Sequence, residues 1–300
     1  FRRCGVAMTD LSSIKPDLLW ELGGILLEGA CWDAEKSVLW FVDIKKKLIH
    51  RLDPTTGKRD SWPAPDQPGF VLPRASGGLV VGMPFGLYHF DPSAGSFTKL
   101  VSVEAEREGN RLNDGFTDAT GRVWFGSMSD GECADSGAFY HWTGGEPVRV
   151  LDGICITNGP ATSPDGKVLY HTDTLGQVVY AGDIQADGSI ANRRVFAKIG
   201  KDEGYPDGMA VDSEGCVWVG LFFGWGIRRY APDGTLLGFV RFPVSNVTKL
   251  AFGGPDLKTV YATTATLNLN DEQRAKQPLA GGLFTFKSPV AGLPPAKVRA

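Results

Sequence analysis

The sequence has few of the residues from which zinc, disulfide and membrane sites are most often built. It contains only four histidines, and its five cysteines are scattered without CxxC spacing. This is not the density of a disulfide scaffold, and it indicates reduced thiols in a cytoplasmic protein. No apolar run is long enough to span a membrane, and the start FRRCGVAMTD lacks the apolar core of a secretory signal.

Several functional motifs are also missing. There is no GxSxG nucleophile elbow, no P-loop, no dinucleotide fingerprint and no HExxH pair. The net charge is −3, with acids and bases mixed along the chain, so neither a basic stripe for nucleic acid nor a polybasic anchor for lipid is present. We therefore expect a small-molecule partner, with no nucleic acid, no membrane and no obligatory protein partner.

What the chain does have is glycine, proline and aromatic residues in a repeating pattern. Apolar strands open at regular intervals of 41 to 49 residues, at Val38, Leu79, Val123, Val168, Val217 and Val260. A period in the forties with short strands and tight turns is typical of a β-propeller. We expect an all-β, six-bladed propeller with four-stranded antiparallel blades as a single domain over residues 18–300, preceded by an N-terminal extension over residues 1–17.

One interval recurs in four of these repeats: an oxygen-bearing side chain, then a valine ten residues later. The four donors are Glu28, Asn113, Asn158 and Asp207. An identical offset predicts equivalent places in four blades. Because the first strand of each propeller blade lines the central channel, the donors should form a ring near one mouth. The other two blades carry Gly69 and Leu250 at this offset, which we interpret as leaving room for a ligand.

Two carboxylates and two amide oxygens are hard ligands suited to calcium, magnesium, manganese or iron(II). So few protein ligands leave coordination positions vacant, as a catalytic cation requires and a sealed structural ion does not. The alternative is that these polar residues only hydrate the channel or hydrogen-bond the strand ends. A metal site in the central channel is the hypothesis that the shared offset favours.

Four segments carry a resemblance to a known family. LLEGACWD, NRLNDGFTDATGRVWFGSM, ITNGPATSPDGKVLYHTD and YPDGMAVDSEGCVWVG resemble the core motifs of the gluconolactonase family, which also contains regucalcin (senescence marker protein). The resemblance runs from about residue 18 to 287. FVDIKKKLIHRLDPTTG, APDQPGF and ICITNGP are most similar to bacterial xylonolactonases.

The resemblance implies hydrolysis of a sugar lactone by a propeller with one divalent cation, Ca²⁺ or Fe²⁺, with Mn²⁺ or Zn²⁺ as further options. By position, Glu28, Asn158 and Asp207 would hold the ion, while Arg111 and Asn113 would bind substrate, with contact between Asn113 and the metal as a further option. The family's usual acidic contact falls on Gly131, so either Asp130 or Glu132 would take that role or the contact would be missing. Around Glu28 the chain also departs from the family's Gly-Glu-Gly-Pro pattern. This departure puts in question the shape of the floor of the expected site beside Glu28.

Ester hydrolysis needs an activated water and a polarised carbonyl, and Asp207 is the candidate general base. Alternatively, Asp207 is only a ligand and a metal-bound hydroxide attacks. Arg111 offers a planar fork to the sugar, or else is a countercharge for Glu28 and Asp207. The expected reaction is opening of xylono-, arabino- or gluconolactone to the aldonic acid; a broader-range metal-dependent esterase and a non-catalytic calcium-binding or scaffold propeller remain as alternatives.

Overall fold

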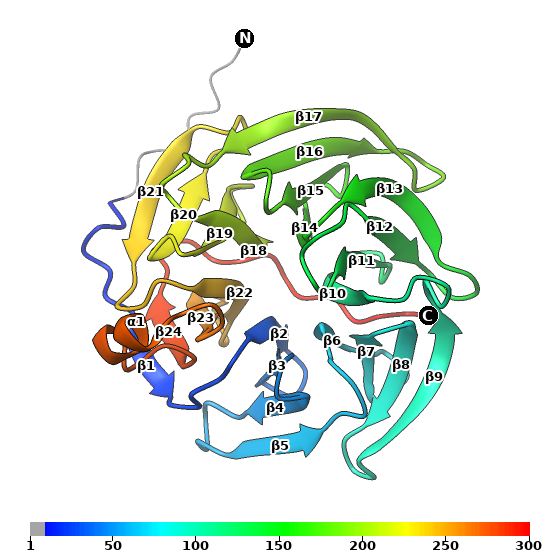
Figure 1. Ribbon diagram of the computed structural model, residues 1–300, viewed down its shortest axis with the longest axis horizontal. Coiled ribbons are helices and arrows are strands. Elements are labelled where there is room, and N and C mark those ends of the chain that lie inside the picture. The colour runs from blue at the N-terminus through cyan, green and yellow to red at the C-terminus, as the bar shows by residue number, and fades with distance from the viewer. Residues whose placement is uncertain (1–9) are drawn as a thin grey trace.

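The computed structural model describes residues 10–300 as six antiparallel sheets of four strands, arranged as blades around a central channel (Figure 1). In blades one to five the strands follow the chain outward from the channel. Their bounds are: blade one, β2 (Leu27–Asp33), β3 (Val38–Asp43), β4 (Leu48–Leu52), β5 (Arg59–Pro63); blade two, β6 (Phe70–Pro73), β7 (Leu79–Met83), β8 (Gly86–Asp91), β9 (Ser96–Ser102); blade three, β10 (Asn110–Thr117), β11 (Val123–Ser129), β12 (Gly137–Trp142), β13 (Val148–Ile154); blade four, β14 (Thr157–Thr162), β15 (Val168–Asp173), β16 (Val178–Ile184), β17 (Ile190–Lys198); blade five, β18 (Tyr205–Val211), β19 (Val217–Phe222), β20 (Gly226–Tyr230), β21 (Leu236–Arg241). The predicted fold is confirmed.

Blade six joins the two ends of the chain. Its inner strands are β22 (Val247–Gly253), β23 (Thr259–Thr264) and β24 (Leu283–Lys287), and its outer strand is β1 (Asp17–Trp20), which pairs with β24. This pairing closes the ring, because the first strand of the described chain completes the last sheet. Part of the expected extension over residues 1–17 lies in residues 1–9, outside the described residues, so that boundary stays a prediction.

Tight turns between the first and second strands carry much of the sequence signal. In blade three, Asp118 accepts backbone N–H groups of Thr120 and Arg122, and its other oxygen accepts the Trp124 indole N–H at 2.9 Å. Asp212 and Trp218 repeat the arrangement in blade five, at 2.8 Å. Each aspartate therefore closes its turn and also satisfies the polar atom of a buried indole, which would otherwise be costly to bury.

Second strands supply the large side chains that fill the space between blades. Trp40, Trp124 and Trp218 are almost fully buried. Burying an aromatic side chain stabilises a fold by roughly 2–3 kcal/mol. Trp40 shares a core cluster with residues of blade two and Trp218 packs on Phe252 of blade six, so these two tie neighbouring blades together. Trp124 contacts His141 within its own blade.

Within the described residues one helix interrupts the all-β pattern, and the sequence prediction did not include it. α1 (Asp271–Lys276) lies in the connection between β23 and β24, with Asn270 as its N-cap and a capping box to Gln273. Beyond the helix, Gln277 Oε1 accepts the backbone N–H of Ser245 at 2.6 Å, which fixes this connection over blade six. In residues 10–300 no helix has the length and apolar character of a membrane crossing.

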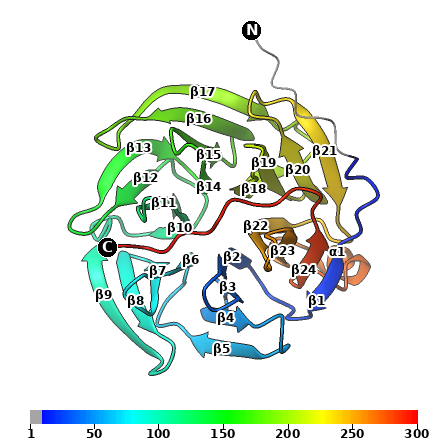
Figure 2. The same ribbon diagram turned by 180° about the vertical axis from the view of Figure 1, so that it is seen from behind.

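The channel has two different ends. The end that faces the viewer in Figure 1 is called the front mouth here, and the opposite end the rear mouth. Residues 290–300 run across the rear mouth (Figure 2) and hydrogen-bond to several blades: Leu293 N to Val211 O, Val298 N to Pro73 O and Arg299 N to Gly121 O. We call residues 290–300 the rear strap.

Candidate active site

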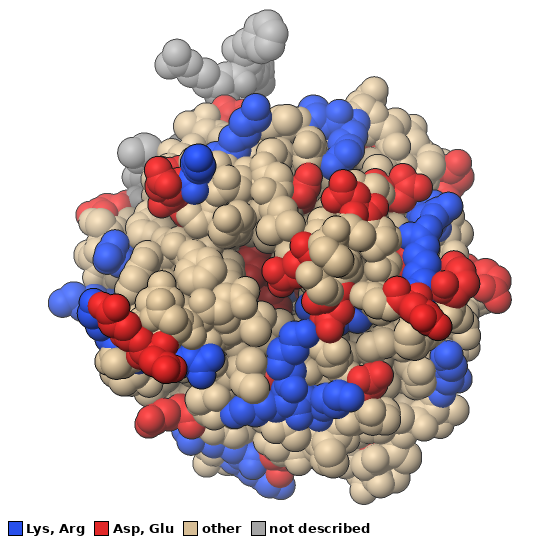
Figure 3. All heavy atoms as spheres, viewed as in Figure 1, with Lys and Arg blue, Asp and Glu red and all other residues tan. Residues whose placement is uncertain are grey.

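The front mouth opens into a cavity of about 220 Å³. Figure 3 shows a hollow in the centre of this face with acidic atoms in its depth. Six of the predicted site residues line the cavity: Glu28, Arg111, Asn113, Glu132, Asn158 and Asp207. The seventh, Asp130, adjoins them through Arg111. The structure therefore brings together residues that are spread over most of the sequence.

A β-bulge in each donor strand directs these side chains. In the first strands of five blades, a stretch of three residues spans the same length as two residues of the second strand. In blade one, for example, Glu28 pairs with Val42 and the next pair is Cys31 with Trp40. The extra residue breaks the ladder locally and re-aims the side chains beside it. Blade two has an unbroken register and supplies no donor.

The four donors are not strictly equivalent in the ladders, although their sequence offset is the same. Glu28 and Asn158 are the last paired residues before the bulge, whereas Asn113 and Asp207 are the first unpaired residues within it. The turns that follow differ by one residue, which restores the common interval to the valine. The expectation of equivalent places is thus wrong by one residue in two blades, yet all four side chains line the cavity because the bulge allows either position to face it.

Hydrogen bonds connect the substrate candidates to the donor ring. Arg111 Nε donates to Asp130 Oδ1 at 2.6 Å, and Arg111 Nη1 donates to Asn113 Oδ1 at 2.6 Å. Lys45 Nζ reaches the same Asp130 oxygen at 2.7 Å. These contacts hold the guanidinium in one orientation, so Arg111 is countercharge to Asp130 rather than to Glu28 or Asp207. They also help hold the pKa of Asp130 down, at about 2.

The network continues through the two amides. Asn113 Nδ2 donates to Asn158 Oδ1 at 2.9 Å, and Asn158 Nδ2 donates to Thr174 Oγ1 at 3.1 Å. Thr174 in turn donates to the Pro206 carbonyl at 2.9 Å. Thr174 therefore sets which way the Asn158 amide faces, a role that the sequence reasoning missed.

Glu28 and Asp207 form a buried carboxyl pair. Burial, followed by the nearby Asp114 charge, raises the pKa of Glu28 to about 7. Burial and the charge of Glu28 raise the pKa of Asp207 well above its usual value. Glu28 Oε2 accepts the Gly29 N–H at 2.8 Å, but the buried Asp207 Oδ1 has no hydrogen-bond partner within the described residues. An orphaned buried oxygen of this kind indicates a missing ligand or water.

Asp114 and Lys249 complete the charges of the ring, and the sequence reasoning missed both. Lys249 Nζ lies 2.6 Å from Asp114 Oδ2, with both side chains buried. Lys249 occupies the bulge of blade six, one residue before Leu250. Lys249 and Leu250 line the rear cavity and not the front one, so the expectation that blade six leaves room for a ligand stays a prediction. Asp114 follows Asn113 directly, which is the signal that could have identified it.

The donor set fits one divalent cation. Three buried carboxylates, Glu28, Asp114 and Asp207, face one ammonium, that of Lys249. Two negative charges are thus left without a partner in the ring when all four groups are ionised. Burying unpaired charge is strongly unfavourable, and a divalent ion among oxygen ligands would balance it. Glu28, Asn158 and Asp207 are the residues whose oxygens would hold the ion.

Gly69 explains why blade two offers no side chain. A Cβ at this position would lie 2.4 Å from the Leu112 carbonyl oxygen and 2.5 Å from that of Asn113. Only glycine permits this close backbone approach, so blade two packs directly against the strand that carries Asn113.

Beside Glu28, Ala30 lines a cavity at the rear mouth, so the departure from the family pattern at this residue lies on the rear side.

An apolar wall faces the polar arc of Arg111 and Glu132 across the cavity. It includes Tyr205 and Phe222, which pair across blade five, together with Phe223 and Leu267. Phe223 has a left-handed backbone (φ 59°), which bulky residues seldom adopt, and its N–H donates to Asn246 Oδ1 at 3.1 Å. Phe70, in contrast, is buried in the core away from the cavity.

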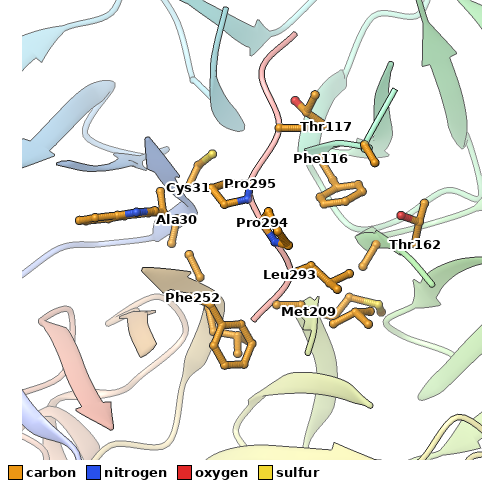
Figure 4. Close-up of a pocket in the computed structure, with 18 of the residues that line it drawn as sticks. Ala30, Cys31, Phe116, Thr117, Thr162, Met209, Phe252, Leu293, Pro294 and Pro295 are labelled. Atoms are coloured by element: carbon orange, nitrogen blue, oxygen red, sulfur yellow. The ribbon is translucent and has the colours of Figure 1, made fainter. Parts of the chain in front are cut away.

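The rear cavity, of about 240 Å³, is separate and largely apolar (Figure 4). Met209, Phe252 and the rear-strap residues Leu293, Pro294 and Pro295 surround it, and Lys249 forms part of its wall. Lys249 thus extends from the apolar rear cavity to the carboxylates of the ring.

Fold and site together define the class: a six-bladed propeller with an oxygen-donor ring and a cationic fork at one mouth of its channel. Residues 26–266 match the model of the SMP-30/Gluconolactonase/LRE-like region. The chain belongs to this family.

Relatives cover almost the whole chain. A 6-deoxy-6-sulfogluconolactonase of Pseudomonas putida is 33% identical over 89% of this chain and 93% of its own length. An L-arabinolactonase of Azospirillum brasilense is 32% identical over 93% of this chain and 94% of its own length. Among solved structures, a calcium-binding protein, regucalcin, from Agrobacterium tumefaciens superposes with a TM-score of 0.93 at 26% identity, covering 98% of this chain and 100% of that one.

Proposed function

We propose that this protein is a lactonase that opens a sugar aldonolactone, such as xylono-, arabino- or gluconolactone, to the aldonic acid with one divalent cation held by Glu28, Asn158 and Asp207. The observation that carries the proposal is the orphaned, buried Asp207 Oδ1 in a cavity that also holds the Arg111 fork. Calcium is the first candidate ion, and the oxygen ligands also admit Fe²⁺, Mn²⁺ and, less well, Zn²⁺.

When bound, a divalent cation would supply positive charge to the lactone carbonyl and to the oxyanion that forms as water attacks. In this proposal Asp207 Oδ1 takes the proton of that water as the water oxygen bonds to the carbonyl carbon, and the supporting observation is that this buried oxygen has no hydrogen-bond partner in the described residues. The ring C–O bond then breaks, and the departing ring oxygen takes that proton from Asp207 to become a hydroxyl, which restores the Asp207 carboxylate. Glu28, whose pKa is raised, contributes as a ligand that ionises near neutrality.

We assign the orientation of the substrate to three polar residues of the cavity wall, Arg111, Asn113 and Glu132. Arg111 and Asn113 line the cavity and are fixed by their mutual hydrogen bond. The amide N–H groups of Asn113 are already bonded to Thr157 O and Asn158 Oδ1, so the Nη2 group of Arg111 is the donor that can meet a sugar oxygen without reorganisation. Glu132 also lines the cavity and is placed to accept sugar hydroxyls. The Asp130 carboxylate is occupied by Lys45 and Arg111, so its proposed role is to position Arg111.

The test is proton release from a panel of xylono-, arabino- and gluconolactone by the protein as prepared, after chelation, and after single ions are added back. Asp207→Asn is expected to lower kcat by about 10²–10⁴-fold. Asp256→Asn, at an exposed turn carboxylate, is the matched control and should match the wild type. No acceleration of any lactone by a protein that still binds one ion would support the calcium-binding reading instead.

A further inference from the structure

The Lys249–Asp114 ion pair is built into the ring although none of the steps above uses it. Its two charged atoms are 2.6 Å apart, Lys249 comes from blade six and Asp114 from blade three, and both are buried. Lys249 Nζ also lies 3.4 Å from the Gly159 carbonyl, on the strand that carries Asn158. The pair therefore spans three strands that surround the donors.

The surroundings of Lys249 direct its charge toward the donors. On the rear side its side chain borders a cavity lined by Met209, Leu250 and Phe252, which offer no charged partner. On the front side its positive charge stabilises the ionised forms of both Glu28 and Asp207, whereas burial destabilises those forms. A buried ion pair is seldom worth its desolvation for stability alone, since an apolar pair of similar volume often serves as well.

We propose that Lys249 and Asp114 fix the net charge of the ring at minus two, so that the site prefers a divalent ion over monovalent and trivalent ions. The ammonium offsets one of three carboxylates, and two charges remain for the ion. Without Lys249 the ring would carry three negative charges, and without the Asp114 charge it would carry one. This inference rests on the proposed cation site but not on lactone hydrolysis.

The test uses the full chain, with Ca²⁺ and Tb³⁺ as probes, and measures affinity by calorimetry and by terbium luminescence at pH 8. Lys249→Met is expected to bind both ions more tightly, with a gain of about tenfold or more that is larger for Tb³⁺. Asp114→Asn is expected to bind Ca²⁺ about tenfold more weakly. The double variant restores the charge of minus two and should return to within about threefold of the wild type.

The opposite signs separate a charge effect from a loss of packing. If both single variants weaken Ca²⁺ binding and the double variant weakens it further, the pair is only structural and the inference is overturned. If the wild type binds no cation, the proposed site itself fails. Thermal unfolding reports whether each variant folds; should Lys249→Met not fold, the expected gain of about tenfold from Asp114→Asn to the double variant carries the test.

Discussion

Asn113 Nδ2 lies 2.9 Å from Asn158 Oδ1 and donates a hydrogen bond to it between blades three and four. Asn113 also accepts from Arg111, so one side chain contacts both a proposed substrate residue and a proposed cation ligand. With the proposed roles, a change at Asn113 would alter substrate binding and cation binding together.

Asn113→Ala is expected to weaken cation binding about fivefold, the value of one lost hydrogen bond, and to raise KM. Asn113→Asp removes the same N–H donor but adds a negative charge beside the ring, so cation affinity should rise while KM still increases. Calorimetry and lactone kinetics check both variants. Equal cation affinities for all three proteins would contradict the link.

The Arg111 fork should act mainly on substrate binding. Arg111→Lys loses one of the two directed contacts, to Asp130 and Asn113, and is expected to raise KM by about 10–100-fold with a smaller change in kcat. Asp130→Asn should shift KM in the same direction by about tenfold, because the guanidinium loses its ionic anchor. Steady-state kinetics decides, with Arg194→Lys as the control at an exposed ion pair. A fall in kcat alone would contradict the assignment.

The contribution of Glu28 to the stability of the metal-free protein should fall as pH rises, against an opposite contribution from buried His50 and His171, whose pKa values are lowered to about 4 and about 3 mainly by burial. The pKa of Glu28 is raised to about 7 in the fold from its ordinary 4.5, so the folded state holds a proton that the unfolded state has lost. The free energy of unfolding therefore decreases between about pH 4.5 and 7, by about 3 kcal/mol for this group, and is level above that range. Urea unfolding of the wild type and of Glu28→Gln at pH 5 and 8 isolates the Glu28 contribution, because the histidines are the same in both proteins.

Saturating cation should abolish most of this dependence on pH, because Glu28 is then ionised in both states. Glu28→Gln should also flatten the profile, with the metal-free variant more stable than the wild type at pH 8. A variant that kept the full slope would show that the slope arises elsewhere.

Most of the fold could be predicted because its signals are local. The spacing of Val38, Val123 and Val217 reports a repeat, and glycine turns report the hairpins within it. The donor ring could be predicted because, in a propeller, residues at the same offset in successive repeats lie at similar positions around the central channel. The interval nevertheless equated Glu28 with Asp207, which the bulges and unequal turns separate by one ladder position.

Side-chain contacts, between blades or within one blade, could not be predicted in this way. Lys249 meets Asp114 across 135 positions of sequence, and Asn158 meets Thr174 because two strands lie side by side. Asp114 and Lys249 are each the second unpaired residue of a first-strand bulge, but counting sequence offsets does not locate a bulge, so the periodicity did not identify the pair. Offset counting placed Leu250 at the blade-six position and missed the lysine beside it, since a bulge shifts the facing residue by one.

Gly69→Ala tests the close approach of blade two to β10. The added methyl would clash with two backbone carbonyls that cannot move aside, so we expect a loss of stability of about 1–3 kcal/mol, or more. KM should rise as well, because one of these carbonyls belongs to Asn113. Gly131→Ala is the matched control, since its Cβ would meet only Cys133 Sγ at 3.5 Å. Thermal unfolding and lactone kinetics of both variants give the comparison.

The rear strap has a kinetic consequence. Residues 290–300 cover the rear mouth, and Lys249 stands between the rear cavity and the donor ring, so the front cavity is a blind pocket rather than a passage. A product formed there must leave by the opening through which the next substrate enters. The aldonate should therefore compete directly with the lactone, and accumulated product would slow its own formation without any separate regulatory site.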